Sequence, residues 1–474
     1  MLFNSYSYLI LLLAAVSIFW LLPIALRRWY VLVLTIAFYA SWTWTYAALP
    51  FLICAGVFVC ARIMAASPRH ACSVTWAGTI FILSILVFFK YRQFLVDNIS
   101  PMLQAFGQSP ARATFAVGLP LGISFYSFEA ISYLMDTRQG RAKKVSFQDL
   151  CLFVTFWPHL LAGPIVRVRE MVPQLGFKKP FDVNMFIRGL DRLIWGLVQK
   201  NVIANNLAPW VDMGFLAQAA GANTTVDNWF FAFAFGLQIY FDFAAYSNMA
   251  IGAACLIGIT LPENFKFPYH AANPAEFWSR WHMTLSRWIR DYLFFPISVR
   301  FQSNPVVLSF SLVGTMALVG LWHGAGWGFV LWGVLHGAYL VLFRIWDRVG
   351  RNFPALHASR VSSLVLRFGT VLAVMAAWIP FRAATLHQSL VMLSSLVTPR
   401  GLRPSYSINF YLITFLVMLF AALEPMLASW LRALEKSVVT LPTLFLLRPA
   451  MYAFGLLLFV IFDDRDNQFI YFQF

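Results

Sequence analysis

Residues 301–343, FQSNPVVLSFSLVGTMALVGLWHGAGWGFVLWGVLHGAYLVLF, contain no Asp, Glu, Lys or Arg. A membrane-spanning helix needs about 20 mainly apolar residues, so this stretch is long enough for two of them. The glycine-rich part at 320–328 is the predicted turn, because glycine adopts conformations that other residues avoid. The stretch therefore predicts a pair of helices joined by a tight turn inside a membrane.

Uncharged stretches of the same kind recur along the whole chain. They lie at 1–26, 29–61, 71–89, 113–128, 150–166, 243–262, 368–381, 404–423 and 449–462. Weaker spans near 193–211 and 228–241 bring the expected total to about 12 transmembrane helices. Segments such as 150–166 and 277–296 are interrupted by polar residues, which is tolerated at membrane depth only against protein or in a wet cavity. The predicted fold is therefore an all-α, multipass bundle with re-entrant segments around a central cavity or channel.

Composition supports this prediction. The 474-residue chain is 60% hydrophobic and 11% charged, with a formal net charge of +16. Soluble domains are about 25% charged, so the chain is expected to be an integral membrane protein. Basic residues such as Arg27 and Arg28 lie between apolar runs, which indicates cytoplasmic loops and not a nucleic-acid-binding face. We expect the lipid bilayer as a partner, no nucleic acid, and one membrane domain over 1–474 whose middle, 115–345, forms the cavity.

The densest ionisable group in an apolar setting is NPAEFWSRWHMTLSRWIRDY, residues 273–292. Asn273 is a suitable helix cap, Pro274 suits the first helical position, and Glu276 lies where a capping carboxylate belongs. We therefore predict one helix that starts here and ends at Pro296.

On one continuous helix, Trp281 and His282 share an apolar face and Arg280 lies beside it. The tryptophans and arginines are most simply explained as interfacial anchors and snorkelling cations. Ionisable residues inside a membrane are functional candidates by default, because burying them is costly. For His282, set among three tryptophans, the spacing leaves a structural and a functional role equally open.

A second histidine, His323, lies in the glycine-rich turn of the opening stretch. Glycine allows a ligand or another backbone to approach closely, and imidazole is well matched to general-base work near neutral pH. A lone membrane histidine is more often structural, so both interpretations stay open for His323. His336, further along the next apolar run, is interpreted as structural.

Other polar residues stand in nearly apolar segments. Asp242 needs a partner, and we expect an ion pair with an arginine or a histidine. The segments 120–129 and 157–165 either line a cavity or join helices. The cysteines have neither disulfide-framework nor metal-site spacing, so no metal site is predicted. These features alone fit either an acyltransferase or a transporter.

Several ordered blocks of the sequence resemble the membrane-bound O-acyltransferase family. They are Pro120–Tyr126, Ala162–Arg167, Ile239–Phe243, Pro262–Phe265, Phe277–Ser286, Ile289–Leu293, Leu321–Gly324 and the ending Phe469–Phe474. Within the family, the chain is most similar to the bacterial membrane proteins of alginate and cellulose acetylation. Next comes the transferase of teichoic-acid D-alanylation.

The resemblance implies roles for particular residues. His323 corresponds to the histidine of the family's Trp-His-Gly block, which is taken as catalytic. His282 corresponds to the second signature histidine and is the second predicted catalytic residue, expected to orient the substrate or to support the developing charge. Residues 115–345 are then the catalytic core. Five weaker candidates for shaping the substrate pocket are Asp242, Asn264, Arg280, Trp281 and Trp322.

The implied activity is O-acyl transfer, in which an acetyl group moves from a cytoplasmic thioester towards an extracytoplasmic polysaccharide of the alginate or cellulose type. The donor is expected to be acetyl-CoA or an acylated carrier, with no bound cofactor. A periplasmic acetyltransferase and polysaccharide machinery are the expected partners, and the bacterial inner membrane is the expected location. The alternatives are D-alanyl transfer to teichoic acid and a non-catalytic acyl conduit or transporter.

Overall fold

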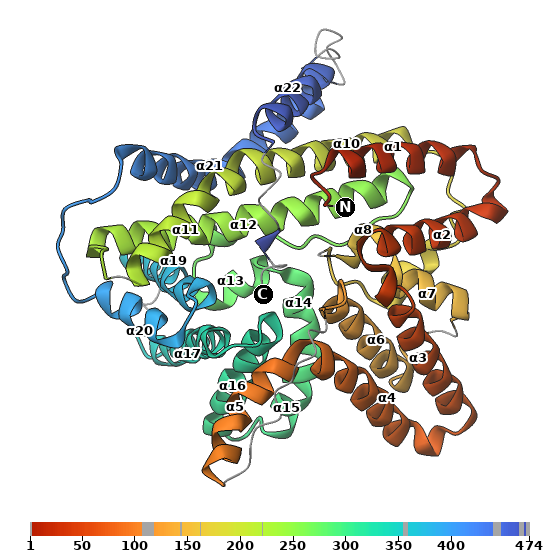
Figure 1. Cartoon of the computed structure of the whole chain (residues 1–474), viewed down its shortest axis with the longest axis horizontal. Helices are drawn as coiled ribbons and strands as arrows, with labels where there is room; N and C mark the ends of the chain where they lie inside the picture. The colour runs from red at the N-terminus through yellow and green to blue at the C-terminus, as the bar shows by residue number, and fades with distance from the viewer. Residues whose placement is uncertain are drawn as a thin grey trace. The chain divides into compact units, whose positions relative to one another are not determined.

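The computed structural model describes residues 2–106, 118–142, 145–161, 163–219, 221–353, 359–438, 447–463 and 469–470. Several predicted features fall partly outside these ranges, namely Met1, residues 115–117 of the predicted core, Ala162, and residues 471–474 of the C-terminal block. Within the described ranges the regular structure is helical and contains no strand, as the ribbon in Figure 1 shows. The predicted all-α class is confirmed.

The chain forms two compact units, Met1–Arg192 with Ala250–Pro262, and Leu193–Met249 with Glu263–Phe474. The helices that begin in the first unit are α1 (Tyr6–Leu21), α2 (Ile24–Thr43), α3 (Leu49–Ala66), α4 (Ala71–Leu86), α5 (Arg92–Ala105), α6 (Ile123–Arg138), α7 (Phe147–Thr155), α8 (Trp157–Leu160), α9 (Val168–Met171) and α10 (Val183–Val198). Those that begin in the second are α11 (Asn205–Ala219), α12 (Thr225–Leu256), α13 (Pro274–Arg280), α14 (Met283–Ile289), α15 (Phe295–Arg300), α16 (Pro305–His323), α17 (Trp327–Gly350), α19 (Arg360–Arg382), α20 (Leu386–Ser395), α21 (Ile408–Val438) and α22 (Leu447–Ile461). The prediction of a single domain over 1–474 stays a prediction.

Seven helical stretches of the described chain are long and apolar enough to cross a membrane. They are Ile24–Tyr46, Leu49–Ala66, Pro68–Ala105, Pro305–His323, Trp327–Gly350, Arg360–Arg382 and Ile408–Leu431, and α1 and α22 are shorter apolar helices. The sequence estimate of about 12 also included weaker spans such as 193–211 and 228–241, which contribute to α10, α11 and α12 and are not among these seven stretches. The chain is a multipass helical membrane protein.

In the first unit, a buried polar contact joins two segments whose role the sequence left open. His159, in the short helix α8, places Nδ1 3.1 Å from Oε1 of Glu129 in α6. The same Glu129 oxygen accepts a hydrogen bond from the backbone N–H of Val166. Both side chains are buried. In the structure, these residues of 120–129 and 157–165 therefore join helices.

In the second unit, α16 and α17 form the predicted helical pair and pack closely (Figure 1). The turn between them is confined to residues 324–326. A methyl group on Gly320 would lie 2.0 Å from the backbone oxygen of Phe329, and one on Gly333 would lie 2.1 Å from that of Met316. Small residues let membrane helices approach one another in this way. The glycines therefore determine how closely α16 and α17 pack.

This packing predicts different outcomes for two glycines of the same helix. Gly320→Ala should destabilise the protein by about 1–3 kcal/mol, because the added methyl group overpacks the contact with α17. Thermal unfolding of the detergent-solubilised protein measures the change. Gly314→Ala is the matched control, since nothing lies within 4 Å of its Cβ position. The control should be neutral or stabilising by up to about 1 kcal/mol, and equal destabilisation by both substitutions would contradict this account.

Candidate functional site

His323 is the last residue of α16 and lies among aromatic rings. Its ring centroid is 4.8 Å from that of Trp322, 5.1 Å from Trp332 in α17, and 5.4 Å from Phe381 in α19. The histidine is only 4% exposed. The imidazole is therefore held at the end of the helix, in a setting made mainly of aromatic faces and edges.

The glycines near His323 make room for protein atoms. A methyl group on Gly324 would lie 2.1 Å from the ring of Phe329, and one on Gly328 would lie 2.5 Å from the backbone oxygen of Pro380. Of the two possibilities that the sequence allowed, close approach of a ligand or of other protein atoms, the structure shows the second at these positions.

The predicted single helix from Asn273 to Pro296 is wrong, because the helix is interrupted at His282. Helix α13 ends at Arg280, His282 has a positive φ of 40°, and α14 begins at Met283. Pro296 does not end a helix either, since it lies in the first turn of α15. A positive φ is uncommon for a residue with a side chain, and such strain is often found at functional sites.

The break is stabilised by a segment that comes before it in sequence. Lys266 N–H donates to the backbone oxygen of Arg280 at 2.9 Å, and Met283 N–H donates to that of Asn264 at 2.8 Å. These bonds satisfy backbone groups near the interruption, which would be costly to leave unpaired in an apolar interior. Tertiary contacts thus turn a helical sequence into two short helices with His282 between them.

The side chain of Asn264 orients the His282 ring. Asn264 Oδ1 accepts hydrogen bonds from the backbone N–H and the hydroxyl of Thr284, at 3.3 and 2.8 Å. The backbone N–H can only donate, so this atom is the amide oxygen. The same oxygen lies 3.1 Å from His282 Nδ1, which must therefore carry the proton. Asn264 Nδ2 donates to Ser247 at 3.1 Å.

This arrangement leaves His282 Nε2 as the unprotonated nitrogen of a neutral imidazole. Nε2 is buried and has no hydrogen-bond partner among the described residues. Burial lowers the pKa of His282 to about 3, because desolvation penalises the charged form. The ring is therefore a buried acceptor, with the Phe243 ring 4.7 Å away at 89°.

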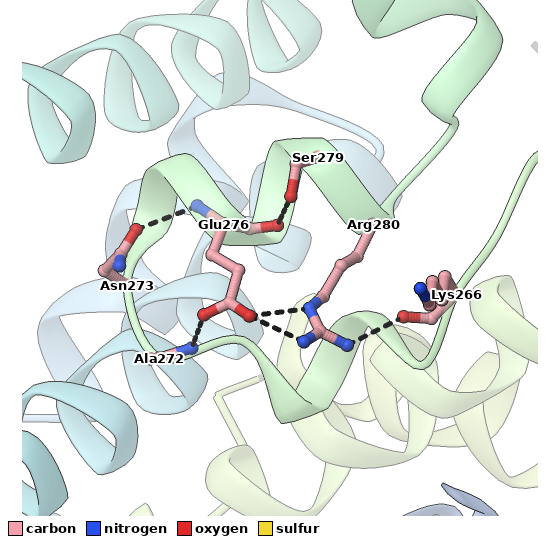
Figure 2. Close-up of polar contacts among 6 residues, drawn as sticks. All are labelled: Lys266, Ala272, Asn273, Glu276, Ser279 and Arg280. Atoms are coloured by element: carbon pink, nitrogen blue, oxygen red, sulfur yellow. Dashed lines mark hydrogen bonds and ion pairs between the residues drawn. The ribbon is translucent and has the colours of Figure 1, made fainter.

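The start of α13 is as the sequence predicts. Asn273 Oδ1 accepts from Glu276 N–H at 2.8 Å, and Glu276 Oε2 accepts from Ala272 N–H at 2.7 Å (Figure 2). Arg280 donates to Glu276 Oε1 through Nε and Nη2, at 2.9 and 2.6 Å, and through Nη1 to the backbone oxygen of Lys266 at 3.2 Å. Arg280 thus links α13 to the segment that supports the break. Its role in a substrate pocket stays a prediction.

Trp281 is fully buried, so its interpretation as an interfacial anchor is wrong. Its ring stacks on Phe277 at 5.7 Å and lies 4.8 Å from Trp378. The ring centroid of Trp322 lies 6.3 Å from that of His282 and 4.8 Å from that of His323. The structure therefore brings the two predicted histidines into one cluster, with Trp322 in contact with both.

The predicted ion pair of Asp242 exists, but its partner is a lysine and not an arginine or a histidine. Lys200 Nζ lies 2.8 Å from Asp242 Oδ1, and both side chains are almost fully buried. Asp242 Oδ2 also accepts the backbone N–H of Ile470 at 2.8 Å. Lys200 lies in a π-helical turn, Gln199–Ala204, a feature frequent at functional sites. Sequence reasoning missed it, although a lysine between Gln199 and Asn201 in an apolar stretch was a usable signal.

Comparison with known proteins identifies the family. Residues 9–381 match the sequence profile of MBOAT, the membrane-bound O-acyltransferase family. The chain belongs to this family. The family resemblance stated from the sequence blocks is confirmed, and the chain is an O-acyltransferase.

Three curated relatives of this chain are named for different acyl-transfer activities. A probable alginate O-acetylase of Azotobacter vinelandii is 37% identical over 81% of this chain and 76% of its own length. A peptidoglycan O-acetyltransferase of Helicobacter pylori is 34% identical over 80% and 75%. A teichoic acid D-alanyltransferase of Bacillus subtilis is 26% identical over 52% and 64%.

The Asn264 network predicts a clear order of stabilities. Asn264→Ala should destabilise the protein by about 1–3 kcal/mol, because it removes the amide oxygen that accepts from Thr284 and from His282 Nδ1–H. Thermal unfolding in detergent measures the loss. Ser247→Ala is the control, since it removes only the hydroxyl bonded to Asn264 Nδ2, and it should cost less. If Asn264→Ala were no more destabilising than Ser247→Ala, the Asn264 amide would not stabilise the helix interruption at His282.

Proposed function

We propose that the chain transfers an acetyl group from a cytoplasmic acyl thioester towards an extracytoplasmic polysaccharide of the alginate or cellulose type. The relatives named as an alginate O-acetylase and a peptidoglycan O-acetyltransferase support acetyl as the transferred group and a polymer as its final acceptor. The single observation that supports a site is the position of His323. It is a buried imidazole at the end of α16, clustered through Trp322 with the oriented imidazole of His282.

In the proposed reaction, a nitrogen of His323 removes the proton from an attacking hydroxyl as its oxygen bonds to the thioester carbonyl carbon. The carbon–sulfur bond then breaks, and the leaving thiolate takes the proton from the imidazolium. The products are an ester and a free thiol. Because His323 is only 4% exposed, the surrounding side chains must move to admit the two reactants.

His282 has a supporting role in this proposal. Its Nδ1 is committed to Asn264, so only Nε2 is available to orient a substrate hydroxyl, as an acceptor. Preorganised polar groups of this kind lower a barrier because they need no rearrangement during the reaction. Asp242, Trp281 and Asn264 act through the protein contacts described above and are positioning residues.

The proposal places the protein in a bacterial inner membrane, where a cytoplasmic donor and a periplasmic acceptor meet. Acetyl-CoA or an acylated carrier protein is the donor, and no cofactor is bound. A periplasmic acetyltransferase receives the acetyl group and passes it to the polymer made by the polysaccharide machinery. Peptidoglycan is a second candidate acceptor, favoured by the Helicobacter pylori relative. D-alanyl transfer to teichoic acid is less supported, because that relative is more distant.

Replacement of His323 tests whether this residue is the general base of the reaction. His323→Ala should reduce thioester consumption by the purified protein in the presence of a hydroxyl acceptor by about 10²–10⁴-fold, the usual contribution of a positioned general base. Thiol release from acetyl-CoA or from an acetylated carrier protein measures the rate. His387→Ala, at an exposed histidine of α20, is the control and should retain the wild-type rate. An undiminished rate in His323→Ala would exclude His323 as the base.

The partner is tested by reconstitution. Purified protein in liposomes with a thioester donor should leave added polysaccharide unacetylated until the periplasmic acetyltransferase is supplied. Ester-linked acetate on the polymer is the readout. Efficient acetylation of the polymer by this chain alone would show that no partner is needed.

A further inference from the structure

His336 is a buried histidine whose two ring nitrogens have no hydrogen-bond partner among the described residues. It lies in α17, one helical turn after Trp332, and is 1% exposed. A neutral imidazole carries one donor and one acceptor, so two polar atoms are left without a partner here.

Such an arrangement is costly unless a further group completes it. Burying a polar group without a hydrogen bond is strongly unfavourable, because the group loses its hydrogen bonds to water and gains none in return. The ring stacks on Phe277 at 5.8 Å and 12°, a contact that a phenylalanine side chain could also make. Packing alone therefore gives no reason for a histidine at this position, and its nitrogens indicate a ligand.

Two tryptophans next to His336 carry further indole nitrogens, and one of them also lies next to His323. The centroids of the His336, Trp332 and Trp278 rings lie 4.9, 5.1 and 5.8 Å from one another. The indole nitrogens of Trp332 and Trp278 also lack partners among the described residues. An indole nitrogen can only donate. The Trp332 ring lies 5.1 Å from the His323 ring and 4.9 Å from the His336 ring.

We propose that the N–H groups of His336 and Trp332 bind the carbonyl oxygen of the acyl thioester and stabilise its negative charge in the transition state. This inference rests on the proposed function of His323. When the hydroxyl oxygen bonds to the carbonyl carbon, an electron pair moves onto the carbonyl oxygen, and the proton moves to His323. The pair returns as the carbon–sulfur bond breaks. Buried donors aimed at such an oxygen are a major source of rate enhancement.

Substitution of His336 by apolar residues separates this role from packing. His336→Phe and His336→Leu should lower kcat for thioester consumption by about 10²-fold with little change in KM, since the donor acts mainly in the transition state. Their unfolding temperatures should equal or exceed that of the wild type, because the unpaired nitrogens are gone. Two apolar variants are used so that one poorly packed ring does not decide the result.

His336→Gln retains a donor and should recover at least part of the lost rate. Trp332→Phe should also lower kcat, whereas Tyr339→Phe, which removes a hydroxyl from a neighbouring ring 5.8 Å away, should not. Wild-type kcat in His336→Phe or His336→Leu would overturn the proposal. So would a marked fall in their unfolding temperature, or a loss in His336→Gln as large as in His336→Phe.

These outcomes are distinct from failure of the proposed function. If the wild-type protein consumed no thioester, or if His323→Ala were fully active, the base assignment would fail. The unfolding temperatures of the His336 variants would still report whether its nitrogens lack partners in the folded protein. If His323→Ala were inactive and His336→Phe fully active, only the oxyanion role would be lost.

Discussion

A break in a helix leaves backbone N–H and C=O groups without their helical hydrogen bonds, and inside an apolar protein these groups need other partners. At the break next to His282, Asn264 provides hydrogen-bond acceptors for such groups. The backbone oxygen of Asn264 accepts a hydrogen bond from Met283 N–H. Its amide oxygen accepts a hydrogen bond from Thr284 N–H and one from His282 Nδ1–H, which orients the His282 ring. Without such acceptors, a continuous helix would satisfy the backbone better. The geometry of the candidate site therefore depends on a residue 18 positions earlier in the chain.

The second unit buries a charged pair and, in a different setting, His323 and His336. Lys200 and Asp242 are almost fully buried, but they pair with each other, and Asp242 also binds the backbone of Ile470. A buried charge without such compensation would be strongly destabilising. His323 and His336 are surrounded mainly by aromatic rings. Aromatic rings exclude water from the two histidines without bringing a formal charge next to them.

Much of the fold could be predicted from the sequence because membranes impose strong local constraints. Length and lack of charge predicted the helical pair of α16 and α17, and Asn273 with Glu276 predicted the start of α13. The ordered motif blocks predicted the family. The two signature histidines, His282 and His323, were found from motifs whose positions a sequence displays directly. Their catalytic roles stay predictions.

The sequence by itself determined the all-α membrane fold, the family and the positions of the histidines, since hydropathy, capping and motifs act over short stretches of chain. Tertiary structure alone decided the break at His282, the burial of Trp281, the Lys200 partner of Asp242 and the filling of the glycine positions by protein atoms. Each of these depends on atoms from distant segments. A helix-compatible sequence gives no local sign that an acceptor from another segment will replace its own hydrogen bonds.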